Sequence, residues 1–342
     1  MLGPGIGALG MVGPSWQFLS FMTVSPSTSR PISRGLSIPR GGFDLAAELY
    51  LPEEPDGQTR YPTVVVATPG SSVKEQIGAT YARALAARGL AVLTFDPAYQ
   101  GRSGGEPRDL EDPAERIADL RHAVDLLDRL DVVDPDRLGV LGICAGGGYA
   151  VSAAMSDHRL RAVGTVVPVN IGRARRQGAA SRPGGVAAVL GEAAHAATVE
   201  ARGGDAARIP WIPDSPEDAE SAGVTDVDLL QAVTYYRTPR GRSPYSTNRR
   251  LARSDALMLA FDAFHLADEL LTQPVAVIVA GAGGSTGSLE DGKQLAALAP
   301  NAEDLIVIEG ARHYEMYDDL GYVEEAATHL SGFFTSHLGP PA

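Results

Sequence analysis

The stretch Leu138-Gly139-Val140-Leu141-Gly142-Ile143-Cys144-Ala145-Gly146-Gly147-Gly148 decides the fold. Residues 138–143 have the apolar pattern of a buried strand, and residues 145–155 favour a helix. The Gly-x-Cys-x-Gly pattern between them predicts a tight, strained turn that presents Cys144 above a sheet, in front of a helix N-terminus. We expect Cys144 to be a nucleophile rather than a packed core cysteine, with a thiol pKa lowered by the helix end and by a nearby imidazole.

Strands alternate with helices on both sides of this turn. A half-exposed strand is predicted from Phe43 to Leu51, and helices are predicted at residues 79–87, 113–127 and 322–334. This alternation indicates an α/β protein with a mainly parallel central sheet that helices cover on both faces. The further buried strands are predicted at residues 61–67, 90–95, 162–169, 275–280 and 305–308.

Residues 171–254 break this alternation but contain several arginines and aromatic residues. A structureless loop of that length would be unusual, so we expect an inserted, mainly helical cap over one end of the sheet. The core then comprises residues 35–170 and 255–338. Residues 1–29 carry no charged side chain and lack the basic region of an export signal. We therefore expect residues 1–34 to be a flexible leader, with Met22 as an alternative start.

Composition and charge exclude several classes of protein. The 342 residues, 44% of them hydrophobic, suffice for one large core, or for one core with a cap. A formal net charge of −13 argues against binding to nucleic acid, and no apolar run reaches membrane-spanning length. One cysteine excludes an internal disulfide and a cysteine-based zinc site. We expect a cytoplasmic protein with no metal, no cofactor and no membrane partner.

A candidate general base lies in Glu309-Gly310-Ala311-Arg312-His313-Tyr314, directly after the last predicted strand. A histidine on that loop can reach back to the turn at Cys144, and the chain order nucleophile-then-histidine fits. The six other histidines lack this combination of strand end and order. His313 is therefore the predicted base.

A candidate oxyanion hole lies in Thr68-Pro69-Gly70-Ser71-Ser72-Val73, after the strand that begins at Tyr61. The backbone N–H of Ala145, which follows the nucleophile, would supply one donor, and the N–H of Ser71 the other. Gly70 is the next candidate. The alternative is that this segment is an ordinary strand-to-helix turn.

The order of these pieces resembles the α/β-hydrolase fold. The cysteine in the turn resembles that of dienelactone hydrolase and related esterases, and that of the fungal polyketide transferases, which move an acyl chain. Residues 68–76, 95–108 and 142–147 look like shared motifs of that group, and the resemblance covers about residues 35–338.

The chain departs from this family at the acid that orients the histidine. The family acid usually follows the strand before the last one, but residues 279–287 contain no carboxylate. Glu290 is the first candidate, Asp262 the second, and a Cys–His dyad without an acid is the third possibility. The resemblance also offers Glu75 as a contact of the resting thiol.

The resemblance implies an enzyme that cleaves or transfers an acyl group from an ester, lactone or thioester. The aromatic residues and arginines of the predicted cap indicate a mid-sized, partly apolar and anionic substrate, such as a polyketide or another secondary metabolite, either free or bound to a carrier protein. Predicted substrate contacts are Gly70, Tyr99, Trp211 and Tyr235. An isomerase or cyclase with His313 as base, or a ligand-binding protein, remains the alternative. A homodimer through an apolar cap is also open.

Overall fold

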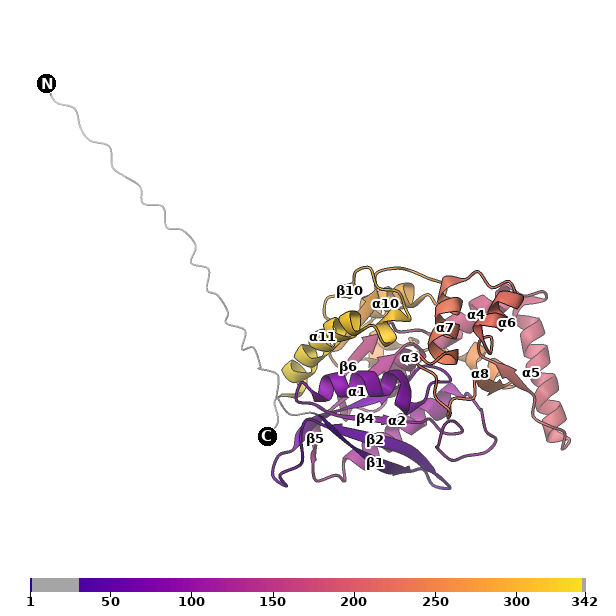
Figure 1. Ribbon diagram of the computed structural model, residues 1–342. Coiled ribbons are helices and arrows are strands. Elements are labelled where there is room, and N and C mark those ends of the chain that lie inside the picture. Colours follow the sequence, from indigo (N-terminus) through magenta and orange to yellow (C-terminus); the bar gives the residue numbers. More distant parts are fainter. Residues whose placement is uncertain (2–30, 340–342) are drawn as a thin grey trace.

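A twisted eight-stranded sheet forms the centre of the computed structural model, which describes residue 1 and residues 31–339 (Figure 1). Most of the predicted leader lies outside the described residues. The strand order is β1-β2-β4-β3-β5-β6-β9-β10. Its strands are β1 (Ile32–Pro39), β2 (Asp44–Leu51), β3 (Tyr61–Ala67), β4 (Ala91–Phe95), β5 (Val133–Ile143), β6 (Leu160–Val166), β9 (Val275–Ala280) and β10 (Ile306–Ile308).

Six neighbouring strands, from β4 to β10 in the sheet order, run parallel, whereas β1 and β2 form an antiparallel edge. The predicted mainly parallel sheet is therefore confirmed. Strand β1 was not predicted, and it begins inside the segment assigned to the leader. Its side chains are mostly exposed, so its sequence lacks the apolar run that marks a buried strand.

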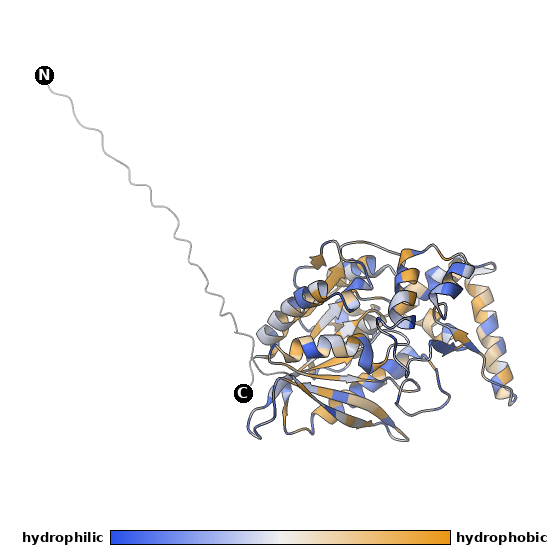
Figure 2. Cartoon of the chain, viewed as in Figure 1, coloured by the Kyte–Doolittle hydropathy of each residue, from blue (hydrophilic) through white to orange (hydrophobic). Residues whose placement is uncertain are grey.

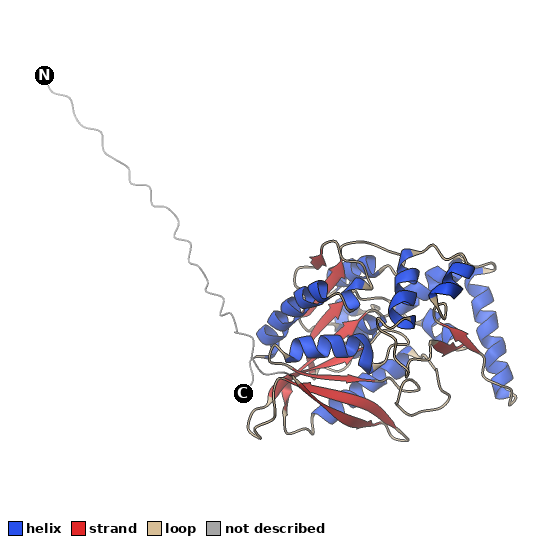
Figure 3. Ribbon diagram, viewed as in Figure 1, coloured by secondary structure: helices blue, strands red, loops and turns tan. Residues whose placement is uncertain are grey.

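Helices cover both faces of the sheet (Figures 1 and 3). One face packs against α2 (Pro113–Leu127), α3 (Ala145–Ala154) and α10 (Ser288–Leu298). The other packs against α1 (Ala79–Ala86) and α11 (Leu320–Leu338). The central strands are mainly hydrophobic, while the helices mix apolar and polar residues (Figure 2). No helix within residues 31–339 is long and apolar enough to cross a membrane.

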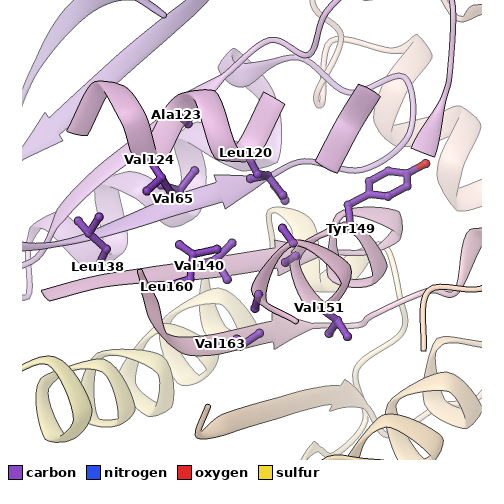
Figure 4. Packing of buried hydrophobic residues seen from close by; sticks show 14 of the residues in the cluster. Val65, Leu120, Ala123, Val124, Leu138, Val140, Tyr149, Val151, Leu160 and Val163 are labelled. Atoms are coloured by element: carbon purple, nitrogen blue, oxygen red, sulfur yellow. The ribbon is translucent and has the colours of Figure 1, made fainter. Parts of the chain in front are cut away.

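The first of these two cores holds the strand that carries the nucleophile. Val65 of β3 and Val140 of β5 are fully buried beneath Leu120 and Val124 of α2 (Figure 4). Burying each such side chain contributes about 1.5–3 kcal/mol. The end of β5 is thereby held rigidly in the middle of the sheet.

Residues 171–254 form a layer beside one end of the sheet (Figure 1). Helix α8 (Ser254–Ala260) packs against α4 and α5 of this layer. We call residues 171–254 the cap. Its elements are α4 (Ile171–Ala180), α5 (Gly185–Ala201), β7 (Arg208–Pro210), α6 (Pro216–Ser221), α7 (Val227–Arg237) and β8 (Arg249–Leu251).

Candidate active site

Cys144 occupies a strained turn between β5 and α3. Its φ of 55° and ψ of −126° are rarely adopted by a residue with a side chain, and such a conformation costs about 1–3 kcal/mol. The glycines around it make the turn possible: a Cβ on Gly142 would overlap the Gly146 carbonyl, and a Cβ on Gly146 would overlap the Ala67 carbonyl. The Cys144 carbonyl accepts hydrogen bonds from Gly147 and Val169, both 2.8 Å, which holds the turn in place.

Cys144 is partly exposed, and it opens into a cavity of about 210 Å³ between the sheet and the cap. The structure brings most of the predicted site residues together there. Ala145, Gly70, Ser71 and Trp211 line this cavity with the nucleophile candidate. Its other lining residues are Pro69, Val169, Ile171, Ala174, Arg175, Ile212, Tyr236, Ser246, Asn248, Thr286, Tyr314 and Tyr317.

The predicted oxyanion loop is held from both sides. From the core, the Arg116 guanidinium donates to the carbonyls of Thr68 and Pro69. From the cap, the Ser246 hydroxyl donates to the Ser71 carbonyl at 2.8 Å. Ser71 itself has a positive φ of 60°. This loop therefore has a defined position beside Cys144, fixed in part by the cap.

His313 is buried behind the thiol, with 2% of its surface exposed. Its Nδ1 lies 2.9 Å from the Ser288 hydroxyl, and its Nε2 lies 3.3 Å from the Tyr317 hydroxyl. The Tyr317 hydroxyl also hydrogen-bonds to the Cys144 thiol. Among the described residues there is no direct Cys144–His313 hydrogen bond, and the Tyr317 hydroxyl interacts with both side chains.

The thiol and the imidazole are both neutral at rest. Burial raises the pKa of the Cys144 thiol to about 11, and the Tyr317 hydroxyl and the Ala145 N–H offset this only in part. Burial lowers the pKa of His313 to about 4, against the opposing charge of Asp228. The expectation of a lowered thiol pKa is therefore wrong, because desolvation of the thiolate outweighs the helix N-terminus.

None of the three carboxylates considered from sequence reaches the site. Glu290 is exposed on α10, while Ser288, two positions before it on the same helix, hydrogen-bonds to the imidazole. Asp262 accepts a 2.7 Å hydrogen bond from Asn170 instead. Glu75 pairs with Lys74 and Arg102, at 2.6 and 2.9 Å. The prediction of Glu290 as the orienting acid is wrong, because a position early in α10 does not by itself point a side chain at the histidine.

A carboxylate near His313 comes from the cap instead. Asp228, in the first turn of α7, is 3% exposed. It accepts hydrogen bonds from the Thr286 N–H at 3.0 Å and from the Thr286 hydroxyl at 2.9 Å. A Cβ on Gly284 would overlap this carboxylate. The glycine-rich loop after β9 thus makes room for a carboxylate that comes from the cap.

Two predicted substrate contacts are also wrong. The Tyr99 hydroxyl donates to Glu115 at 2.8 Å, outside the cavity. Tyr235 is 2% exposed and packs edge-on against the ring of Tyr317, with centroids 5.1 Å apart. Its neighbour Tyr236 lines the cavity instead. The orientation of α7 about its axis determines which of the two adjacent tyrosines faces the cavity, and the sequence pattern does not predict that orientation.

Solved structures show the same fold. The crystal structure of PA2218 from Pseudomonas aeruginosa superposes with a TM-score of 0.81 and 29% identity, over 92% of this chain and 95% of that one. The α/β hydrolase GrgF from Penicillium has a TM-score of 0.68 at 19% identity, over 90% and 99% of the two chains, and it supports the fold alone.

Two bacterial relatives match most of this chain. Protein YcjY of Escherichia coli is 36% identical over 86% of this chain and 95% of its own length. PA2218 is 32% identical over 87% of this chain and 79% of its own length. No protein-family model matches the chain.

Shorter matches concern proteins named for acyl chemistry. The thiohydrolase aneE of Aspergillus aculeatus is 34% identical over 37% of this chain, and the acyltransferase drtE of Aspergillus calidoustus is 34% identical over 36%. Fold, elbow and relatives together define an enzyme of the α/β-hydrolase class, of the hydrolase or acyltransferase type. Within that class, the chain belongs to the family of YcjY and PA2218.

Proposed function

We propose that this enzyme cleaves or transfers acyl groups through a covalent thioester on Cys144. The observation that carries the proposal is the position of the thiol: it lies at a strained elbow, opens into a cavity, and contacts a hydroxyl that reaches a buried imidazole. A structural cysteine has no need of that strain or of that contact.

The first half of the reaction forms the thioester. The Cys144 sulfur attacks the acyl carbonyl carbon while its proton passes to the Tyr317 hydroxyl, whose own proton passes to Nε2 of His313. The N–H groups of Ala145 and Ser71 hold the oxyanion. When the tetrahedral intermediate collapses, the carbon–heteroatom bond breaks and the leaving thiol or alcohol takes the proton from the imidazolium. Because both partners start neutral, proton transfer accompanies the attack.

The second half releases the acyl group to water or to another acceptor. An acyl thioester is open to oxygen and nitrogen nucleophiles, so one site serves both hydrolysis and transfer. The mostly apolar cavity suits an acyl chain of modest size. The names thiohydrolase for aneE and acyltransferase for drtE support a thioester substrate, and we propose a polyketide bound to a carrier protein as its class.

Intact-protein mass spectrometry tests this proposal. The enzyme is mixed with a p-nitrophenyl ester, and the mass of one acyl group is followed on the protein while nitrophenol is released. We expect an adduct on Cys144 that forms and then decays. In Cys144→Ala the adduct and the turnover should both disappear, and His313→Ala should slow adduct formation by roughly 10²- to 10⁴-fold.

The alternative chemistry gives a different result in the same experiment. An isomerase or cyclase that uses His313 as a base forms no acyl adduct on Cys144 and releases no nitrophenol from the wild-type enzyme. Ester turnover that survives in Cys144→Ala would exclude the covalent mechanism.

A further inference from the structure

The cavity contains one side chain that an acyl pocket for neutral chains does not need. Arg175 of α4 lines it beside the apolar residues Val169, Ile171 and Ala174. The Arg175 side chain is 27% exposed. A cation next to apolar walls is costly unless an anion accompanies it.

Its two arginine neighbours on α4 are hydrogen-bonded to other parts of the fold. Arg173 binds Asp291 at 2.6 Å and the Thr286 carbonyl at 2.8 Å. Arg176 donates to the carbonyls of Leu259 and Phe261, at 2.9 and 2.6 Å. Neither of these arginines lines the cavity. Of the three, only Arg175 is placed to meet a substrate.

The charge around Arg175 is only partly neutralised. Its Nη2 donates to Asp255 at 2.6 Å, but the same carboxylate also binds Nε and Nη2 of Arg250, at 2.9 and 3.2 Å. Two guanidinium groups thus share one carboxylate. Burial and the charge of Arg250 lower the pKa of Arg175 from its ordinary value. Within residues 31–339, Nε and Nη1 of Arg175 have no hydrogen-bond partner.

We infer that Arg175 binds a carboxylate at the far end of the acyl chain, so that the preferred substrates are half-thioesters or half-esters of dicarboxylic acids. This inference rests on the proposed function, because the acyl chain must enter with its carbonyl at Cys144. Nη1, which has no hydrogen-bond partner among the described residues, can donate to a carboxylate oxygen, and the positive charge of the guanidinium attracts the anion. The carboxylate of the substrate would balance the positive charge that remains because Arg175 and Arg250 share Asp255.

Matched thioesters of N-acetylcysteamine test the inference. Butanoyl, pentanoyl and hexanoyl thioesters are compared with succinyl, glutaryl and adipyl thioesters of equal chain length, and kcat/KM is measured by chromatography. We expect the best carboxylated substrate to exceed its neutral partner by at least 10-fold. In Arg175→Gln this ratio should fall by roughly 10- to 100-fold, while the neutral rate stays within a few-fold. Arg175→Lys should retain part of the preference.

Arg182→Gln is the matched control. Arg182 follows the end of α4, and its substitution removes the same positive charge. It pairs with Glu192 and does not line the catalytic cavity. Its variant should keep the wild-type ratio. Equal losses on neutral and carboxylated substrates in Arg175→Gln would show that Arg175 only ties α4 to Asp255, and would overturn the inference.

Binding to Cys144→Ala separates this inference from the proposed function. By calorimetry, the best carboxylated thioester should bind more tightly than its neutral partner, and Arg175→Gln should abolish the difference, whether or not the wild-type enzyme turns either over. Equal binding would refute the carboxylate site even if Cys144 is acylated. A thioester of 4′-phosphopantetheine could instead be preferred over one of pantetheine in a manner that depends on Arg175. That result would place the bound anion on the thiol portion of the substrate and would also refute the carboxylate site.

Discussion

A tyrosine hydroxyl, rather than the imidazole, touches the thiol of Cys144. Tyr317 lies one helical turn after His313 in sequence, so its 3₁₀ turn (Glu315–Tyr317) carries the hydroxyl back to both groups. The tautomer with Nδ1–H donating to Ser288 leaves Nε2 free to accept from Tyr317. The hydroxyl can then receive one proton and pass on another without moving.

Removing this hydroxyl tests the relay. In Tyr317→Phe we expect kcat/KM for an activated ester to fall by roughly 10²-fold, because the thiol loses its path to the base. Steady-state kinetics provide the measurement. Tyr235→Phe is the control, since Tyr235 is equally buried and packs against Tyr317, but lies outside the cavity. If Tyr317→Phe keeps full activity, His313 reaches the thiol directly once substrate is bound.

The raised pKa of the thiol predicts slow alkylation at neutral pH. Only the thiolate reacts with iodoacetamide, and a pKa of about 11 leaves little of it at pH 7. The rate of Cys144 carbamidomethylation should therefore keep rising up to about pH 11, as measured by mass spectrometry. A rate that is already constant above pH 8 would contradict the raised pKa of the Cys144 thiol.

At the scale of elements, the cap contributes to the catalytic core. Helix α7 places Asp228 in the space left by Gly284, against Thr286. Its negative charge opposes the desolvation of His313 and so favours the imidazolium that forms during attack. Asp228 acts through the base and not on the substrate, which makes it a positioning residue.

Replacing this carboxylate should weaken the base. In Asp228→Asn we expect kcat to fall by about 10-fold, equivalent to one pKa unit of lost imidazolium stabilisation. The acid limb of the kcat/KM profile should move to lower pH, since Asp228 raises the pKa of His313. Glu290→Gln, which changes an exposed carboxylate of α10, should leave both unchanged. A fall in activity without a shift in the acid limb would indicate a purely structural role.

Chain order and local pattern predicted the elements that hold the reaction, but not the contacts between them. The sequence offered Cys144 and His313 as candidates because a strand end and a glycine-flanked turn are local signals. Asp228 was missed because its approach to the β9 loop joins segments far apart in sequence. Tyr317 was missed because a tyrosine one turn past the base has no distinguishing pattern. Tyr99 and Tyr235 failed because side-chain direction depends on packing.

At the scale of the whole molecule, the buried neutral histidine couples stability to pH. His313 has a pKa of about 4 when folded, against an ordinary value of 6.5. Between these two pH values the unfolded chain binds a proton that the folded chain does not, so the free energy of unfolding decreases as the pH falls from 6.5 toward 4. Above pH 6.5 this contribution is constant.

Urea unfolding at a series of pH values measures this coupling. The wild-type protein should lose more stability between pH 6.5 and 4 than His313→Gln, because the variant has no imidazole to protonate. His329→Gln, at an exposed position of α11, should follow the wild-type curve. Parallel curves for wild type and His313→Gln would mean that the folded protein accommodates a charged imidazole.

The links from Ser246 to the Ser71 carbonyl and from Asp228 to Thr286 have a consequence for how this enzyme can diversify. In an enzyme whose cap only shields the substrate, the cap can be exchanged as a unit without loss of the catalytic residues. In this protein, replacing the whole cap would remove both Ser246, which supports the oxyanion loop, and Asp228, the carboxylate near His313. We therefore expect new substrate ranges to arise by single substitutions on the cavity side of the cap, with Ser246 and Asp228 retained.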